Sequence, residues 1–195
     1  MSAKLEFFYD YVSPYSYMAN SQLEQLGDFV IDYRPMFLGG VMKATGNQPP
    51  GMLLPRLAYM LHDLDRWARH YGIAFRSNSI FPQNTLAALR LALVAKRDGC
   101  FDRLHQRLFD AMFIDDRDLS DLAVLREILV AAGLDADAML AAIEDPDIKA
   151  ALKTNTEEAV ARGAFGAPTM FVGDEMFFGN DRLPFVRAAL EASGR

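Results

Sequence analysis

The 195-residue sequence predicts an α/β fold, in which a four-stranded sheet is flanked by helices and interrupted by a large helical insertion. Two observations predict the sheet: residues 1–38 carry a strand–helix–strand pattern, and residues 163–195 carry two strands and a helix. The third observation is that residues 39–162, after an opening loop, repeat apolar side chains at helical spacing almost throughout. Because neither end completes a sheet alone, we expect the two ends to form one domain and to pair across the insertion.

The first elements lie near the N-terminus. Apolar and aromatic side chains predict strands at residues 5–9 and 29–36. Residues 14–26 between them predict a helix, and Gly27 is the glycine expected just after its end. A helix of this length between two strands is typical of a βαβ unit.

The insertion begins with residues 39–51, where glycines and prolines are so frequent that we expect a loop. Ser120 is the expected N-cap of one of the helices that follow, Gly133 closes that helix, and Gly163 ends the last one. The predicted helices of the insertion cover residues 57–68, 86–94, 101–112, 122–129 and 147–162.

The C-terminal end returns to strands. Residues 169–172 and 175–178 flank the pair Gly173-Asp174, which is a hairpin signal, and residues 183–192 predict a closing helix. Strands in this order, with a helical insertion between them, are also found in thioredoxin-like folds.

Composition and charge exclude several classes of function. A net charge of −6 with scattered basic residues argues against a nucleic-acid surface. No run of about 18 apolar residues predicts a membrane span, and the N-terminus lacks the pattern of a signal peptide. Cys100 is the only cysteine, which excludes an internal disulfide and favours a cytoplasmic protein. His62, His70 and His105 lack metal-ligand spacing, so we expect no metal site.

The first chemically specific stretch is Ser13-Pro14-Tyr15-Ser16, at the junction between a strand and a helix. Thioredoxin-type redox proteins carry a Cys-x-x-Cys pair at such a junction. Ser13 before a proline is by itself a common helix start. The same geometry also concentrates unpaired N–H groups, which stabilise an anion, so Ser13 could hydrogen-bond a thiolate that another molecule supplies.

Two further stretches have both a structural and a functional interpretation. Ala167-Pro168 ahead of a strand is either an ordinary turn or a cis peptide whose preceding residue offers its backbone to a bound peptide. Asp181, next to Asn180, is either the N-cap of the last helix or a receptor for an ammonium group.

The stretches "FYDYVSPYSYMAN", "GNQPPGMLLPR", "DLDRWARHYGI" and "AFGAPTMFVGDEMFFGNDRL" together resemble the kappa-class glutathione transferase family. Within that family the sequence is more similar to the bacterial 2-hydroxychromene-2-carboxylate isomerases. The resemblance runs in order from about residue 5 to residue 190. It implies a thioredoxin-like fold of the DsbA type, a homodimer, and reduced glutathione as the cofactor.

The resemblance also implies roles for individual residues. Ser13 matches the catalytic serine at the glutathione sulfur, and Asn47 in "GNQPP" matches an asparagine near the glutathione. Ala167, with Pro168 after it, matches the position that binds the cysteinyl backbone. Asn180 and Asp181 match the pair that binds the glutamyl group.

One position departs from the family. The kappa enzymes have a lysine after "PP", whereas the corresponding stretch here contains Arg56, which would replace that lysine as a cation for the glycyl carboxylate. Side chains that could position a small aromatic carboxylate substrate and its phenol also come from this region and its neighbours. The candidates are Arg34, Phe37, Arg56, Trp67 and Asn84.

The implied reaction is a glutathione-dependent cis–trans isomerisation of 2-hydroxychromene-2-carboxylate or a close aromatic analogue. The thiolate would add reversibly to the conjugated carbon of the ring-opened substrate, and rotation about the new single bond would precede elimination. Two alternatives remain open: a kappa-like glutathione transferase or peroxidase, and a non-catalytic, DsbA-like peptide binder.

Overall fold

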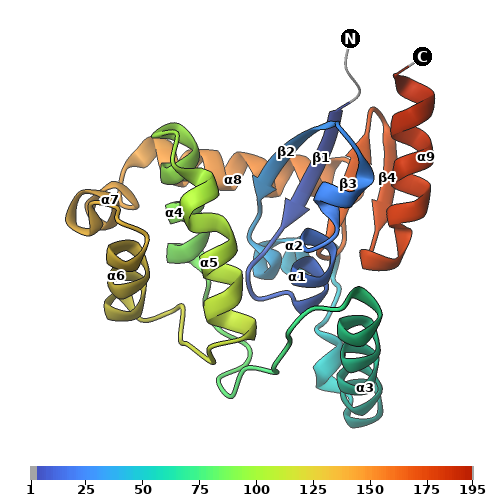
Figure 1. Ribbon diagram of the computed structural model, residues 1–195, viewed down its shortest axis with the longest axis horizontal. Helices are drawn as coiled ribbons and strands as arrows, with labels where there is room; N and C mark the ends of the chain where they lie inside the picture. Colours follow the sequence, from blue (N-terminus) through green and yellow to red (C-terminus); the bar gives the residue numbers. More distant parts are fainter. Residues whose placement is uncertain (1–3, 195) are drawn as a thin grey trace.

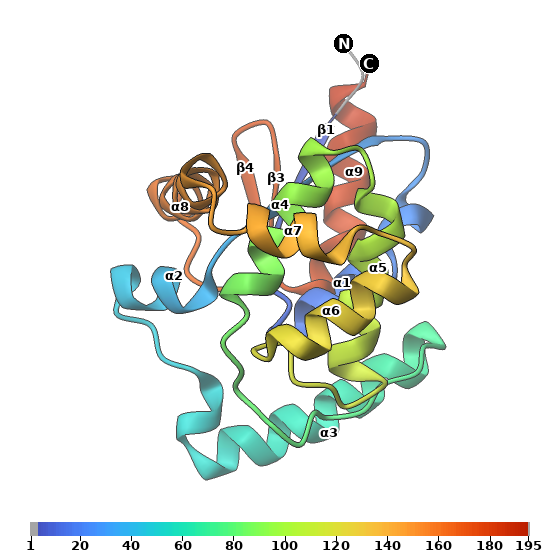
Figure 2. The same ribbon diagram turned by 90° about the vertical axis from the view of Figure 1, so that its left-hand side faces the viewer.

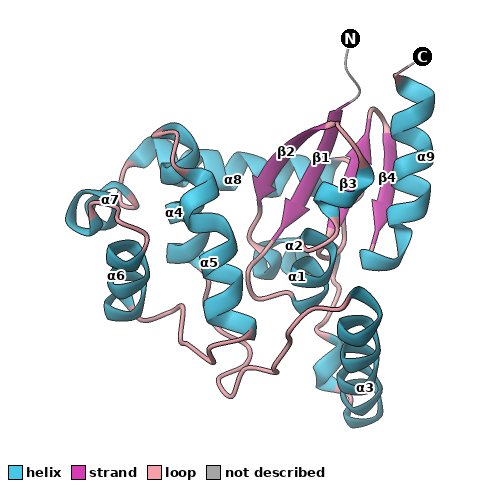
Figure 3. Ribbon diagram, in the orientation of Figure 1, coloured by secondary structure: helices cyan, strands magenta, loops and turns pink. Residues whose placement is uncertain are grey.

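The computed structural model describes residues 4–194 and contains one four-stranded sheet in the order β2-β1-β3-β4. β1 pairs in parallel with β2 and antiparallel with β3, and β3 pairs antiparallel with β4. The two ends of the chain therefore pair across the insertion, as the sequence predicts (Figures 1 and 3). The strands are β1 (Lys4–Tyr9), β2 (Val30–Pro35), β3 (Thr169–Val172) and β4 (Glu175–Phe178).

Helices cover both faces of the sheet, and a further group of helices lies beside the β2 edge (Figures 1 and 2). They are α1 (Pro14–Asn20), α2 (Leu38–Thr45), α3 (Leu54–Tyr71), α4 (Leu86–Arg97), α5 (Phe101–Phe113), α6 (Leu122–Ala131), α7 (Ala136–Ala142), α8 (Pro146–Ala161) and α9 (Leu183–Ser193). Short 3-10 turns lie at η1 (Leu23–Leu26), η2 (Pro50–Met52) and η3 (Asn180–Arg182). No helix within residues 4–194 is long and apolar enough to cross a membrane.

The two faces of β1 belong to different apolar clusters because successive side chains of a strand alternate. Phe7 and Tyr9 face the larger cluster, which includes side chains of α1, α5 and α9. Phe8 faces a smaller cluster with Ala159 of α8 and Val41 of α2. α8 thus covers one face of the sheet although it lies within the proposed insertion, and the domain boundaries at residues 39 and 162 remain a prediction.

Three predicted elements are wrong in detail. The helix expected over residues 14–26 ends at Asn20, because Ser21 caps it and donates its hydroxyl to the Met18 carbonyl at 2.7 Å; η1 follows. The loop expected over residues 39–51 begins instead with α2. Its Gly40 lets the helix approach α8, since an added Cβ would lie 3.3 Å from the methyl carbon of Thr156.

The third difference concerns the start of α6. Asp121, not Ser120, is its N-cap, because the Asp121 carboxylate accepts from the Ala123 N–H at 2.8 Å. The Ser120 hydroxyl donates instead to Asp118 at 2.6 Å. α7 is a helix that the periodicity did not indicate, and Asp135 caps it in the same way at the Ala138 N–H.

α3 extends away from the sheet (Figure 1), and tyrosine hydroxyl groups, in addition to its buried apolar side chains, connect it to the rest of the protein. Tyr15 of α1 donates to Asp63 of α3 at 3.1 Å. Tyr71 at the other end of α3 donates to the carbonyl of Asn180 at 3.1 Å. Tyr17 holds the following loop by donating to the Ala74 carbonyl at 2.6 Å. α3 is therefore connected to α1 and η3, the segments in or next to which candidate site residues lie.

Candidate active site

Ser13 lies where β1 gives way to α1, and it is the N-cap of that helix. Its hydroxyl accepts from the Ser16 N–H at 3.2 Å and donates to the Ala167 carbonyl at 2.9 Å. The residue is only 4% exposed, while Ser16 at the fourth position of the motif is fully buried. The first of the two serines is therefore the one at the margin of the surface, at the positive end of a short helix.

The Ala167–Pro168 peptide is cis and precedes β3. The Ala167 carbonyl accepts a hydrogen bond from the Ser13 hydroxyl. The backbone N–H of Ala167, in contrast, has no hydrogen-bond acceptor within residues 4–194. The Pro168 carbonyl accepts from the Gly179 N–H at 3.1 Å, directly before η3. One short region therefore joins the start of α1, the start of β3 and the start of η3, although these segments lie more than 150 residues apart in the sequence at their extremes.

Asp10 is a buried residue of this region that the sequence analysis did not single out. Its carboxylate accepts from the Thr85 hydroxyl at 2.5 Å, from the Val12 N–H at 3.1 Å and from the Leu38 N–H at 2.8 Å. Its carbonyl accepts from the Ser13 N–H at 3.0 Å. Burial raises the pKa of this carboxyl above its ordinary value, and these hydrogen bonds offset part of that rise. The sequence signal that could have identified Asp10 is its position as an acidic residue directly after an apolar strand.

Asn47 lies in the exposed segment between α2 and α3, and its side chain reaches toward the β3 start. Its amide donates to the Phe165 carbonyl at 2.8 Å, and its oxygen accepts from the Gln48 N–H at 2.9 Å. Phe165 is two residues before Ala167, so the structure brings Asn47 to the same side of the molecule as the cis peptide.

Asn180, Asp181 and Trp67 form a second group near the C-terminal end of α3. Asn180 is buried and its side-chain amide donates to the Tyr71 hydroxyl at 3.3 Å. Asp181 is exposed, forms a 2.6 Å ion pair with Arg182, and lines a cavity of about 360 Å³ together with Trp67. Burial, Asp63 and Tyr59 raise the pKa of Tyr15 in the first turn of α1, and the Asp181 carboxylate adds a smaller contribution.

An apolar cavity of about 300 Å³ begins at Pro14, the residue after Ser13. Leu61 and Leu64 of α3 line one side of it, and Phe75 and Phe81 line another. Arg56 is exposed on the first turns of α3, one helical turn before the cavity-lining Met60. The cavity is large enough for a single aromatic ring with small substituents.

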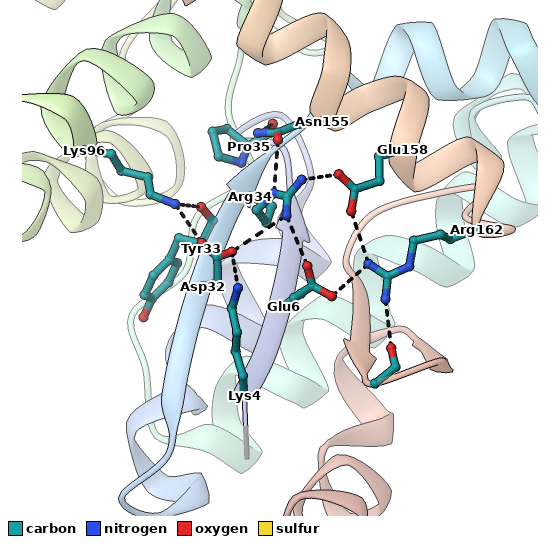
Figure 4. Close-up of polar contacts among 11 residues, drawn as sticks. Lys4, Glu6, Asp32, Tyr33, Arg34, Pro35, Lys96, Asn155, Glu158 and Arg162 are labelled. Carbon is teal, nitrogen blue, oxygen red and sulfur yellow. Dashed lines mark hydrogen bonds and ion pairs between the residues drawn. The ribbon is translucent and has the colours of Figure 1, made fainter. Parts of the chain in front are cut away.

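Arg34 lies away from this cavity, in a group of charged side chains on the sheet that we call the sheet ion cluster (Figure 4). Its guanidinium donates to Asn155 at 3.0 Å, to Glu6 at 3.1 Å, and also to Glu158. Glu6 in turn accepts from Arg162 at 2.8 Å. The members of the cluster are Lys4, Glu6, Asp32, Arg34, Lys96, Glu158 and Arg162.

The two remaining substrate candidates also lie outside the cavity at Pro14. Phe37 lines a groove between α2, α4 and α8. Asn84 is exposed just before α4, where its oxygen accepts from the Leu86 N–H at 3.2 Å. Among the described residues no group of three or more His, Cys, Asp or Glu side chains could hold a metal ion.

Comparison with known proteins gives a consistent result. The family model of the DSBA-like thioredoxin domain matches residues 4–191. The chain is 32% identical to a 2-hydroxychromene-2-carboxylate isomerase of Sphingobium xenophagum, over 97% of this chain and 99% of that protein. It is 28% identical to human glutathione S-transferase kappa 1, over 92% of this chain and 87% of that protein.

Solved structures agree with this assignment. The structure of a 2-hydroxychromene-2-carboxylate isomerase superposes with a TM-score of 0.88 at 27% identity, covering 97% of this chain and 95% of that one. A probable DsbA oxidoreductase from Streptomyces coelicolor superposes with a TM-score of 0.81 at 23% identity, covering 98% and 89%, and shares the fold. The chain belongs to the family of 2-hydroxychromene-2-carboxylate isomerases and kappa-class glutathione transferases, built on a DsbA-like thioredoxin domain.

Proposed function

We propose that this protein is a glutathione-dependent cis–trans isomerase that interconverts 2-hydroxychromene-2-carboxylate and trans-o-hydroxybenzylidenepyruvate, or a close aromatic analogue. The observation that carries the proposal is the Ser13 hydroxyl, held at the N-terminus of α1 against Ala167 and next to an apolar cavity. Family members named as this isomerase support the choice of reaction.

The residues around Ser13 fit glutathione. The unpaired N–H of Ala167 suits a peptide carbonyl, as the cysteinyl unit would present. Exposed Asp181 suits the glutamyl ammonium with Asn180 beside it, and Asn47 with Arg56 would bind the glycyl end. Bound glutathione would supply a thiolate nucleophile, which a free thiol with a pKa near 8.5 provides only in small amounts at neutral pH.

Ser13 would stabilise that thiolate. Its hydroxyl now donates to the Ala167 carbonyl and can turn to a sulfur acceptor, and the helix N-terminus favours the negative charge. The cavity lined by Pro14, Leu61 and Phe75 would hold the aromatic ring away from water. Of the predicted substrate contacts, Arg56 and Trp67 lie on α3, which borders this region, whereas Arg34, Phe37 and Asn84 lie elsewhere.

The test is the isomerisation of 2-hydroxychromene-2-carboxylate, followed by absorbance with and without glutathione. We expect turnover to require glutathione, and Ser13→Ala to lower kcat/KM by about 100-fold, the typical effect of removing one donor from a developing negative charge. The rate of the variant should rise at higher pH than that of the wild type, because the thiolate loses a stabilising donor.

Ser193→Ala, at the end of α9, is the matched control, and we expect it to keep the wild-type rate and pH profile. Turnover without glutathione would contradict the cofactor assignment. Binding of glutathione with an unchanged rate in Ser13→Ala would contradict the role given to Ser13.

A second candidate function is conjugation of glutathione to electrophiles or reduction of peroxides, which the relatives named glutathione S-transferase kappa 1 support. Turnover of chlorodinitrobenzene or a hydroperoxide, with none of the chromene, would favour it. The third candidate is a non-catalytic peptide binder, which the unpaired Ala167 N–H would also suit. Binding of an unfolded peptide without any effect of glutathione would favour that function.

The proposal includes a cytoplasmic location and a homodimer. A single cysteine, Cys100, is typical of a reducing compartment. Exposed apolar side chains gather around η2 and the first turns of α3, among them Met52, Leu53, Leu54 and Tyr59. Such a concentration is a common feature of subunit contacts.

A further inference from the structure

A groove separate from the cavity at Pro14 lies between α2, α4 and α8, which are neighbours in Figure 2. Its volume is about 460 Å³, and none of the residues that line it also lines the cavity at Pro14. Phe37, Leu86, Leu152 and Val160 give it an apolar floor and walls. It therefore has the size and lining of a small-molecule site. We call it the α2–α4–α8 groove.

The charges that border the α2–α4–α8 groove are mostly positive. Arg90, Lys149 and Lys153 line it together with Glu157, and Glu144 next to it pairs with Lys149 at 2.6 Å, which leaves a small excess of positive charge. This excess of positive charge occurs in a chain whose net charge is −6. A ligand that complements the groove has an apolar body and a negative group.

Arg90 supplies the most specific feature of the groove. Its Nε–H is buried and has no hydrogen-bond partner among the described residues, an arrangement that folded proteins rarely leave uncompensated. Its terminal nitrogen makes one long contact of 3.4 Å with Glu144, and the side chain is 23% exposed. The guanidinium therefore has unused donors, and an arginine guanidinium can donate two parallel N–H groups to one carboxylate.

We propose that the α2–α4–α8 groove is a second ligand site, which binds a small amphipathic carboxylate with its apolar body on Phe37 and Leu152 and its carboxylate on Arg90. Lys149 and Lys153 at the border pair with Glu144 and Glu157, so Arg90 is the cation that would select the carboxylate. The site does not require glutathione or Ser13, because among the described residues that line it Phe37 is the only one predicted to bind cofactor or substrate.

The first experiment titrates the protein with octanoate, in the absence of glutathione, and follows backbone amide signals by NMR. We expect saturable one-to-one binding that shifts the signals of Gly40 and Thr156, which line the groove. Octan-1-ol and protonated octylamine have the same alkyl chain without the negative charge, and we expect at least about tenfold weaker binding for both. Equal binding of the three compounds, or octanoate shifts confined to the cavity at Pro14, would overturn the proposal.

The second experiment compares variants. Arg90→Met should weaken octanoate binding by about tenfold, and Lys153→Glu, on an exposed side chain, should weaken it several-fold with little risk to folding. Arg97→Met on the same helix and Arg69→Glu on α3 are the matched controls outside the groove. Ser13→Ala should bind octanoate as the wild type does, so failure of the proposed isomerase function and failure of this site give different results. Unchanged affinity in both groove variants would overturn the assignment.

Discussion

At the scale of single residues, the position of Ser13 depends on Asp10. The Asp10 carboxylate accepts donors from the loop before α1, from the first residue of α2 and from Thr85 at the start of α4. Its carbonyl also accepts from the Ser13 N–H. A buried carboxylate with this many donors fixes its surroundings, because leaving any of them without an acceptor would be costly. The backbone of Ser13 is thus positioned through Asp10 by hydrogen bonds from the start of α2 and the start of α4.

A second buried group, His105, lies on the opposite side of β1 from the sheet ion cluster. Its Nδ1 lies 2.9 Å from the Tyr11 hydroxyl and its Nε2 lies 2.9 Å from the Asn20 side-chain oxygen. With Nε2 protonated, the imidazole donates to Asn20 and accepts from Tyr11, which satisfies both nitrogens in the neutral form. Burial, with a smaller contribution from Lys96, lowers the pKa of His105 to about 3.

We predict that this histidine makes folding stability depend on pH. The unfolded chain binds a proton on the imidazole near pH 6.5, whereas the folded protein binds it only near pH 3. Unfolding therefore takes up a proton between these values, and stability falls as the pH falls through that window. The slope is about 1.4 kcal/mol per pH unit between pH 6 and pH 4. The side chain in His105→Gln cannot titrate, so the free energy of unfolding of this variant should depend on pH with a slope smaller by this amount. Urea unfolding at each pH measures the slope.

The control for this prediction is His62→Gln, because His62 is exposed on α3. We expect it to keep the wild-type dependence of the unfolding free energy on pH. A wild-type protein and a His105→Gln variant with the same slope between pH 6 and pH 4 would show that His105 is not held neutral.

Sequence patterns could locate some site residues but not others. Ser13 and Ala167-Pro168 lie in short motifs that can be recognised from the local sequence: a helix cap followed by a proline, and a proline before a strand. Asp10 is different, because its partners Leu38 and Thr85 lie 28 and 75 residues away and no local pattern connects them. Arg34 shows the reverse case. Its charge is evident from the sequence, but its ion pairs with Glu6 and Glu158 are not.

At the scale of elements, α2 shows why a local pattern can be wrong. Gly39 and Gly40 indicate a loop by propensity, yet they lie in a helix whose first N–H is bound by Asp10 and whose glycine faces Thr156 of α8. Close packing against α8 uses the small size of Gly40, and the side-chain cap comes from another element. Long periodic helices such as α5 could be predicted, because their apolar spacing depends on nearby residues alone.

The contact of α8 with the sheet is stabilised by the sheet ion cluster. Glu6 of β1 accepts from both Arg34 of β2 and Arg162 directly after α8, so one carboxylate joins three segments. The guanidinium of Arg162 also lies 3.7 Å from the centre of the Phe171 ring in β3.

We predict that Glu6→Gln lowers the free energy of unfolding by about 1–2 kcal/mol, because two partly buried guanidiniums lose their shared negative charge. The matched control is Glu157→Gln, which removes an exposed partner of Lys153 at 3.7 Å and should change stability by less than about 0.5 kcal/mol. Urea unfolding of the wild type and both variants measures the difference. Equal effects of the two substitutions would show that the cluster adds no more than an ordinary surface pair.

At the scale of the whole molecule, the order of elements was enough to predict the four-stranded sheet, whereas the bounds of the insertion stay a prediction. The two chain ends can satisfy their strand edges only by pairing with each other, and this constraint does not depend on exact element boundaries. The placement of α3 could not be predicted in the same way, because it depends on contacts with residues far away in the sequence, both the packing of its buried side chains in the main apolar cluster and the hydrogen bond of Tyr15 with Asp63.

The exposed face of α3 carries the last prediction, that the protein forms a homodimer through η2 and the start of α3. Leu54 is 79% exposed and Tyr59 is 64% exposed, and burying apolar side chains of this size is the main favourable contribution to association. The double variant Leu54→Glu with Tyr59→Glu should dissociate the dimer, because it places two charges in an apolar contact. Val130→Glu, at an exposed apolar residue of α6, should leave the dimer intact. Sedimentation equilibrium distinguishes the two states by mass: a wild type that sediments as a monomer, or a double variant that remains a dimer, would place subunit contacts elsewhere or exclude them.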